Sequence, residues 1–214
     1  MGSAEIYRIL LLLSMGTALA FWIRIPVPRR PVFRVVGLLI GVGLLVELTG
    51  AALALHSVNN NAMYNGYTLV DCLLALLICY LMVPERALVV GVGAALVLGA
   101  MAWDFFDQGA DPHVFLDRGI VLSAVVLTLV LMAVLWQLAQ TSAVPLHQVP
   151  GFWLFMGLLI YFGCMSPILT IIDRVYAHDH ALAQRLYQIM PVLCIARYAI
   201  TAFACKLERG TAHG

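Results

Sequence analysis

Three ionisable side chains interrupt runs of hydrophobic residues, and they are the first candidates for chemistry. They are Glu47, Asp71 and Arg197. An ionised side chain inside a membrane costs roughly 2.5–3.5 kcal/mol on insertion scales, so such residues usually face the interior of a helix bundle and serve a function. Two carboxylates can bind a cation or a polar ligand. Arg197 can form an ion pair with Glu47 or extend its guanidinium to the inner membrane surface.

Polar residues precede Asp71 at a helical spacing. Asn61, Tyr64, Asn65 and Thr68 follow the pattern i, i+3, i+4, i+7, which is one face of a helix that begins early. Two interpretations stay open. One is an interhelical hydrogen-bond network that fixes the order of the helices. The other is a water-accessible pocket for a small polar or cationic ligand, formed by Glu47, Asn61, Tyr64, Asn65, Tyr67, Asp71 and Arg197.

Signatures of membrane enzymes and cofactor sites are absent from the sequence. There is no HExxH motif for a zinc protease and no GxSxG motif for a serine hydrolase. No lysine lies deep in the seventh apolar run to carry a retinal Schiff base, because the only lysine, Lys206, is at its inner boundary. His178 and His180 are too few ligands for a metal site. We therefore predict no catalytic residues, no cofactor and no metal.

The elements that must position these residues are membrane helices, because the composition leaves no other solvent for them. Hydrophobic residues make up 63% of the 214 residues and charged residues 11%. A soluble domain of this size could not cover that much apolar surface. The formal net charge of +1 gives no basic excess for a nucleic acid. The five cysteines all lie in apolar runs, which does not fit a disulfide framework.

Seven apolar runs are long enough, or nearly so, to cross a bilayer as helices. We expect one all-α domain over residues 1–214, with the first run retained as a helix and not cleaved as a signal peptide. Pro167 and Pro191 should kink the last two helices. The runs are roughly 5–23, 33–55, 67–83, 87–104, 118–139, 151–173 and 185–205.

The charges of the connecting segments predict the orientation. Seven of the twelve cations lie on one side, and four lie on the other: Arg8, Arg118, Arg174 and Arg185. The positive-inside rule places the larger group in the cytoplasm, with the N-terminus outside and the C-terminus inside. At a rise of 1.5 Å per residue, Glu47, Asp71 and Arg197 then lie about 10, 6 and 18 Å below the outer surface. The larger group is Arg24, Arg29, Arg30, Arg34, Arg86, Lys206 and Arg209.

The sequence resembles small uncharacterised bacterial seven-helix integral membrane proteins. The resemblance rests on Glu47-x-x-Gly50, on Asn61-x-x-Tyr64-Asn65-x-Tyr67 with an acid at Asp71, and on the segment FWLFMGLLIYFG at 152–163. Relatives often have Glu where this chain has Asp71. The resemblance implies a multi-pass protein of the bacterial inner membrane, and it implies no activity.

The leading functional interpretation is a receptor-like membrane sensor. Its pocket would bind a small polar ligand from outside the cytoplasm. The short tail KLERGTAHG would leave signalling to a separate cytoplasmic or membrane partner. A transporter of a small solute or ion is the alternative, although the two halves of the chain share no visible repeat. An accessory subunit of a larger membrane complex is the third interpretation.

Overall fold

The computed structural model describes residues 3–111, 114–176 and 178–211, and every regular element in these ranges is a helix. In chain order the elements are α1 (Ser3–Ile23), α2 (Pro31–Leu55), α3 (Asn61–Met82), η1 (Pro84–Arg86), α4 (Ala87–Asp107), α5 (Asp117–Thr141), η2 (Leu146–Gln148), α6 (Pro150–Tyr176), α7 (His180–Tyr187) and α8 (Ile189–Thr211). The prefix η marks a short 3-10 helix.

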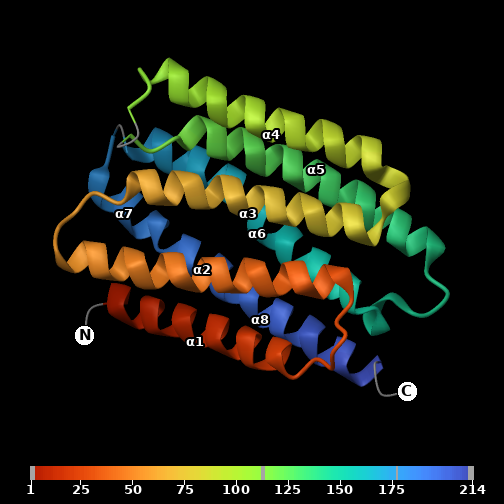
Figure 1. Ribbon diagram of the computed structural model, residues 1–214. Coiled ribbons are helices and arrows are strands. Elements are labelled where there is room, and N and C mark those ends of the chain that lie inside the picture. The colour runs from red at the N-terminus through yellow and green to blue at the C-terminus, as the bar shows by residue number, and fades with distance from the viewer. Residues whose placement is uncertain (1–2, 112–113, 177, 212–214) are drawn as a thin grey trace. The chain divides into compact units, whose positions relative to one another are not determined.

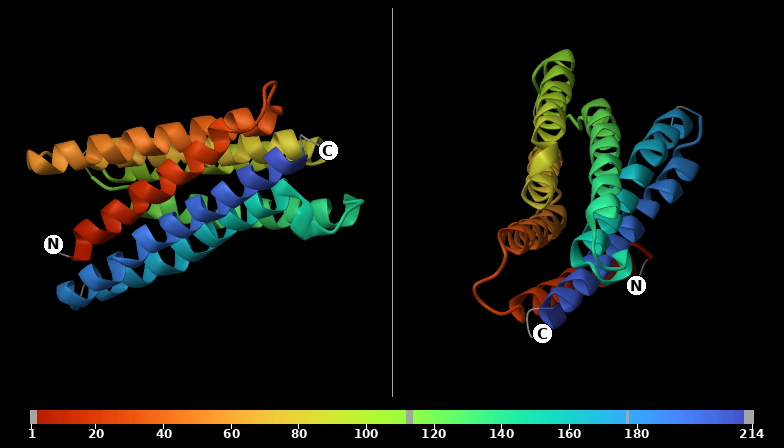
Figure 2. Two further views of the ribbon diagram at one scale, coloured as in Figure 1. Left: turned by 90° about the horizontal axis from the view of Figure 1, so that it is seen from below. Right: turned by 90° about the vertical axis from the view of Figure 1, so that its right-hand side faces the viewer.

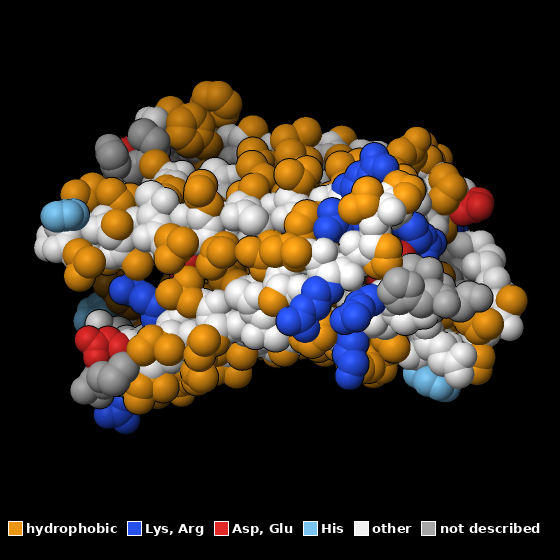
Figure 3. Space-filling model, turned by 60° about the horizontal axis from the view of Figure 1, so that its bottom comes forward, with side chains coloured by type: hydrophobic (Ala, Val, Ile, Leu, Met, Phe, Trp, Pro, Cys, Tyr) orange, Lys and Arg blue, Asp and Glu red, His pale blue; other side chains and the backbone are white. Residues whose placement is uncertain are grey.

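Seven segments of the described chain are long and apolar enough to cross a membrane, and α7 and α8 together form the last of them. Large apolar side chains lie on the outer surface of these helices: Leu13 is 60% exposed, Leu45 67% and Leu129 62%. On the face shown in Figure 3, hydrophobic side chains cover the lengths of the helices, and Lys and Arg side chains lie toward the helix ends. In the described residues, the structure confirms the prediction of an all-helical chain with seven segments that are long and apolar enough to span a membrane.

The third helix begins six residues earlier than the expected 67–83. The Asn59 side chain explains this, because its Oδ1 accepts a hydrogen bond from the Asn61 backbone N–H at 2.8 Å. Asparagine commonly closes a turn in this way, and the turn starts a helix. Asp71 is therefore ten residues from the start of α3, about 15 Å along the helix axis. Asp71 therefore lies farther from the start of its helix than the expected bounds 67–83 implied.

The last membrane segment is interrupted, which differs from the expected continuous helix over 185–205. A turn at Gln188 separates α7 from α8, and Pro191 follows in the first turn of α8. Proline has no N–H to bond the carbonyl four residues earlier, which here belongs to Tyr187. Pro191 therefore lies at a helix start, where proline is tolerated, and not in mid-helix. Pro167, by contrast, lies inside α6, as predicted.

Contacts divide the chain into two compact units, which we describe separately. Unit 1 contains residues 1–29 and 135–214. In it, α8 packs against both α1 and α6, and α7 packs against α6. Helices α1 and α8 run side by side in the same direction (Figures 1 and 2). The start of α6 lies beside the later part of α8, because the rings of Trp153 and Phe203 are 5.0 Å apart.

Unit 2 contains residues 30–134. Helix α3 packs against α2 and α4, and α4 also packs against the first part of α5. Gly93 allows the second contact, because a Cβ atom there would lie 2.8 Å from Val130 Cγ2 and 3.4 Å from Leu76 Cδ2. The small residue thus lets three helices meet at one level.

Candidate functional site

The site begins with the packing of α2 on α3 in unit 2. A Cβ atom at Gly50 would lie 2.5 Å from the Tyr64 hydroxyl oxygen and 3.2 Å from Met63 Cε. Only glycine therefore lets the Tyr64 hydroxyl lie this close to the α2 backbone. This contact fixes the register of the two helices, which are antiparallel because a short connection joins the end of α2 to the start of α3.

That register brings the two acids to similar levels. Glu47 lies one turn from Gly50, and Tyr67 lies one turn from Tyr64, so Glu47 and Tyr67 are at one level. Asp71 lies one further turn along α3, about 6 Å away along the axis. Side chains in a helix lean toward its N-terminus. Because the helices are antiparallel, Glu47 and Asp71 lean toward each other's level.

Burial distinguishes the two carboxylates. Asp71 is 3% exposed and lies on the buried side of α3 with Cys72 and Ala75. Glu47 is half-buried and follows Gly43 by four residues on the stripe of α2 that faces its neighbours. The pair therefore combines an enclosed acid with a more accessible one. Carboxylates and nearby phenols in this arrangement can bind a cation or exchange a proton.

Asn65 has a different part in the structure. Its Nδ2 donates to the Val114 carbonyl at 2.7 Å, and its Oδ1 accepts from the Leu116 N–H at 3.1 Å. Both sides of the amide are thus used by the backbone that leads into α5. A buried backbone N–H needs such a partner. Asn65 therefore attaches the α4–α5 connection to α3.

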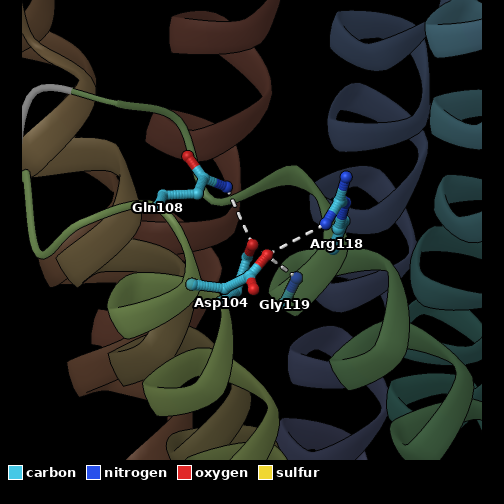
Figure 4. Close-up of polar contacts among 5 residues, drawn as sticks. Asp104, Gln108, Arg118 and Gly119 are labelled. Carbon is cyan, nitrogen blue, oxygen red and sulfur yellow. Dashed lines mark hydrogen bonds and ion pairs between the residues drawn. The ribbon is translucent and has the colours of Figure 1, made fainter.

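Asp104 forms the second polar junction of unit 2 (Figure 4). Its side chain is fully buried, and Oδ2 accepts a hydrogen bond from the Gly119 N–H at 2.8 Å. Oδ1 accepts from Gln108 Nε2 at 2.8 Å. The Gly119 N–H is in the first turn of α5, where backbone donors have no partner in their own helix. Asp104 therefore caps α5 from the last turn of α4.

Gly119 is essential to that junction, and the sequence pattern did not reveal it. A Cβ atom there would lie 3.1 Å from Asp104 Cβ and 3.2 Å from the Ala100 carbonyl oxygen. The residue beside it, Arg118, forms an exposed ion pair with Asp107 at 3.0 Å (Figure 4). The sequence did show a glycine directly after a charged residue at the start of a predicted helix. It did not show that this glycine packs against Asp104 in α4. The hydrogen bonds of Asp104 connect α4 to α5, as expected from an interhelical hydrogen-bond network that fixes the order of the helices.

Arg197 belongs to unit 1, whereas the other six predicted ligand-binding residues belong to unit 2. Its guanidinium carbon lies 4.7 Å from the centre of the Tyr161 ring, 5.5 Å from that of Phe162 and 5.6 Å from that of Tyr198. The side chain is 1% exposed. Tyr161 is in the middle of α6, so the guanidinium is enclosed by rings and does not extend to a helix end. The Glu47–Arg197 ion pair stays a prediction.

The remaining predicted residues lie on α3. Asn61 is its first residue, and Tyr64 and Tyr67 follow in its first two turns. The Thr68 hydroxyl donates to the Tyr64 carbonyl at 2.9 Å, which is a bond within the helix. Because α3 is continuous from Asn61, the predicted face of Asn61, Tyr64, Asn65 and Thr68 exists. The structure therefore groups Glu47 and Asp71 with Tyr64 and Tyr67 on one helix pair.

Comparison with known proteins identified no relative: no family model matches the chain, and no curated protein or solved structure is detectably similar to it.

Proposed function

We propose that this chain is a membrane sensor that binds a small polar or cationic ligand between α2 and α3. Glu47 and Asp71 supply the negative charge. Tyr67 supplies a phenol group at the level of Glu47, and Tyr64 supplies one at the level of Gly50, one turn away. The single observation that carries the proposal is Asp71, a carboxyl group 3% exposed at the middle of a membrane-spanning helix. Ionisable residues in such positions are functional by default because their burial is costly.

The charges within unit 2 favour a ligand with positive charge. Its cations other than Arg118 are Arg30 and Arg34 at the start of α2 and Arg86 before α4. These positions lie at the ends of α2 and α4 farthest from Glu47, and half the length of α3 separates them from Asp71. Arg118 is paired with Asp107. A cationic ligand, or a proton, would therefore complement the two acids.

The proposed orientation gives the ligand access from outside the cytoplasm. The positive-inside rule places the end with seven cations inside, so the α2–α3 connection lies outside. Glu47 is then about 12 Å from the outer end of α2. The bacterial inner membrane is the proposed location, in line with the resemblance described above. A separate partner at the inner surface would receive the signal.

A ligand screen with two matched double variants tests this proposal. Thermal unfolding of the purified protein is measured with a panel of small amines, quaternary ammonium ions and neutral polar solutes. We expect at least one cation to raise the unfolding temperature of the wild type and not of Glu47→Gln/Asp71→Asn. The control, Glu85→Gln/Asp173→Asn, removes one Glu and one Asp that are both exposed, and it should respond as the wild type does.

Two further outcomes separate the sensor from its alternatives. Uptake of the stabilising cation into proteoliposomes would identify a transporter, because a sensor binds without moving solute. Stabilisation that persists in Glu47→Gln/Asp71→Asn would contradict the proposed site. Purification of the wild type in a fixed ratio with a second membrane protein, together with no response to any solute, would favour an accessory subunit.

A further inference from the structure

One end of unit 1 carries exposed positive charge. Helices α1 and α8 run in the same direction, so their last turns lie at the same end of the unit (Figure 1). Arg24 follows α1, and Lys206 and Arg209 are in the last turns of α8. All three are exposed. We call these three residues the basic end.

The cations of the basic end have no ion-pair partner among the described residues. The one acid nearby in α8, Glu208, is 4% exposed and so presents almost no charge to solvent. Two cations of unit 2, Arg34 and Arg86, differ because each already has an interaction within the chain. Positive charge is therefore available for an external partner at the basic end of unit 1.

Aromatic rings place the membrane surface at this level. Trp22 is one residue before the end of α1, and its ring lies 4.2 Å from the guanidinium carbon of Arg29. Arg29 is held there because its Nη2 also donates to the Ile23 carbonyl at 3.1 Å. Trp153 packs on Phe203, one turn before Lys206. Tryptophan prefers the boundary between hydrocarbon and headgroups, and cations lie just beyond it.

The geometry points to the basic end as a binding surface for the headgroups of anionic phospholipids. The Trp22 and Trp153 rings would lie at the depth of the upper acyl chains. Arg24, Lys206 and Arg209 would then lie at the depth of the phosphates, where their charge complements that of an acidic headgroup. An acidic protein would have to approach from the aqueous side, whereas these cations lie within one or two turns of the tryptophans. This surface is distinct from the proposed ligand site in unit 2.

Quenching by brominated lipids tests the inference. The Trp103→Phe protein keeps Trp22, Trp136 and Trp153 as reporters, and it is reconstituted in phosphatidylcholine containing brominated phosphatidylglycerol or brominated phosphatidylcholine. We expect stronger quenching by the brominated phosphatidylglycerol, with a preference that weakens at high salt. Each cation near the surface should contribute about fivefold to that preference, so Arg24→Gln/Lys206→Gln/Arg209→Gln should abolish it.

Two matched triple variants complete the test. Arg8→Gln/Arg174→Gln/Arg185→Gln removes three exposed cations from the opposite end of unit 1, and it should keep the preference. Arg24→Lys/Lys206→Arg/Arg209→Lys keeps the charge, and it should keep the preference too. The inference is overturned if the wild type quenches equally with both lipids, as expected for a surface that serves an acidic protein. It is also overturned if both neutralising variants lose the preference to the same extent.

Discussion

The two units of this protein bury charged and polar groups in different ways. Unit 1 surrounds the Arg197 guanidinium with the rings of Tyr161, Phe162 and Tyr198. Unit 2 satisfies Asn65 and Asp104 with backbone N–H and carbonyl groups. Aromatic rings stabilise a cation through their negative faces, and this needs no exact direction. Hydrogen bonds to the backbone do need exact directions, so they also fix where a connection lies.

Asp71 occupies a different place in unit 2 from Asn65 and Asp104. It is as enclosed as Asn65, but it lies within the stripe of α3 that packs against other helices and not at a junction with a connection. Its place inside a membrane-spanning helix makes Asp71 the candidate ligand-binding group, whereas Asn65 and Asp104 hold connections in place. A scaffold residue should lower stability when it is changed, whereas a ligand-binding residue should not.

The largest effect should follow the removal of Arg197. Arg197→Ala deletes a large buried side chain and its contacts with three rings, so we expect a loss of about 3–5 kcal/mol in the free energy of unfolding. Denaturant titration in detergent measures this. Arg197→Lys keeps the charge without the planar group and should lose less. A loss no larger than that of the exposed Arg185→Ala would show that the rings do not stabilise unit 1.

A smaller loss is expected at Asn65. Asn65→Ala leaves the buried Leu116 N–H without its acceptor and the Val114 carbonyl without its donor, which should cost about 1–3 kcal/mol. Hydrogen exchange at Leu116 should accelerate in the variant. Asn60→Ala is the matched control, since Asn60 makes no side-chain capping bond at the start of α3. Equal stability of the two variants would contradict the structural role of Asn65.

The contact between α4 and α5 should be less costly to disturb. Gly119→Ala places a Cβ atom 3.1 Å from Asp104 Cβ and 3.2 Å from a backbone oxygen, so a shift costing about 1–2 kcal/mol is expected. In Gly99→Ala, a change within α4, the new Cβ atom meets no atom within 4 Å. That control should be neutral or gain up to about 1 kcal/mol, because alanine favours a helix. Thermal unfolding of both proteins decides the sign.

The smallest change in stability should be at Asp71. Asp71→Asn keeps the shape and removes a charge that is costly to bury, so stability should stay within about 1 kcal/mol of the wild type or rise. Ligand-induced stabilisation should be lost at the same time. A loss of stability like that of Asn65→Ala would place Asp71 in the scaffold. Asp71→Glu, which keeps the acid, separates the need for charge from the need for shape.

Hydropathy was sufficient to predict the helices but not all of their ends. The seven spans follow from apolar runs whose length is set by the bilayer. The start of α3 was harder to predict, because Asn61, Tyr64 and Asn65 are polar and are also typical of a loop between helices. The turn closed by the Asn59 side chain starts the helix at Asn61. The sequence predicted a kink at Pro191 inside one continuous helix. The structure instead has a turn at Gln188, so Pro191 lies in the first turn of a new helix.

The candidate site could be predicted only in part. The polar face of α3 could be predicted because its residues are close together in the sequence, and their spacing alone indicates one side of a helix. The contacts of Asn65 with Val114 and Leu116 join residues 49 and 51 positions apart. Those of Arg197 with Tyr161 and Phe162 depend on how α6 meets α8. A single sequence contains no information on such pairs, and for the same reason Gly119 was not recognised as a partner of Asp104.

The division of the chain has a consequence for biosynthesis. Helix α1 leaves the ribosome before the other described helices, yet its partner in unit 1 is α8, which follows all of them in the chain. Unit 2 is continuous in the chain and can assemble as soon as α5 has entered the membrane. Helix α1 must then remain in lipid without this neighbour until α8 has been synthesised. A premature stop codon anywhere before α8 would therefore leave α1 unpaired, even though α1 itself was made correctly.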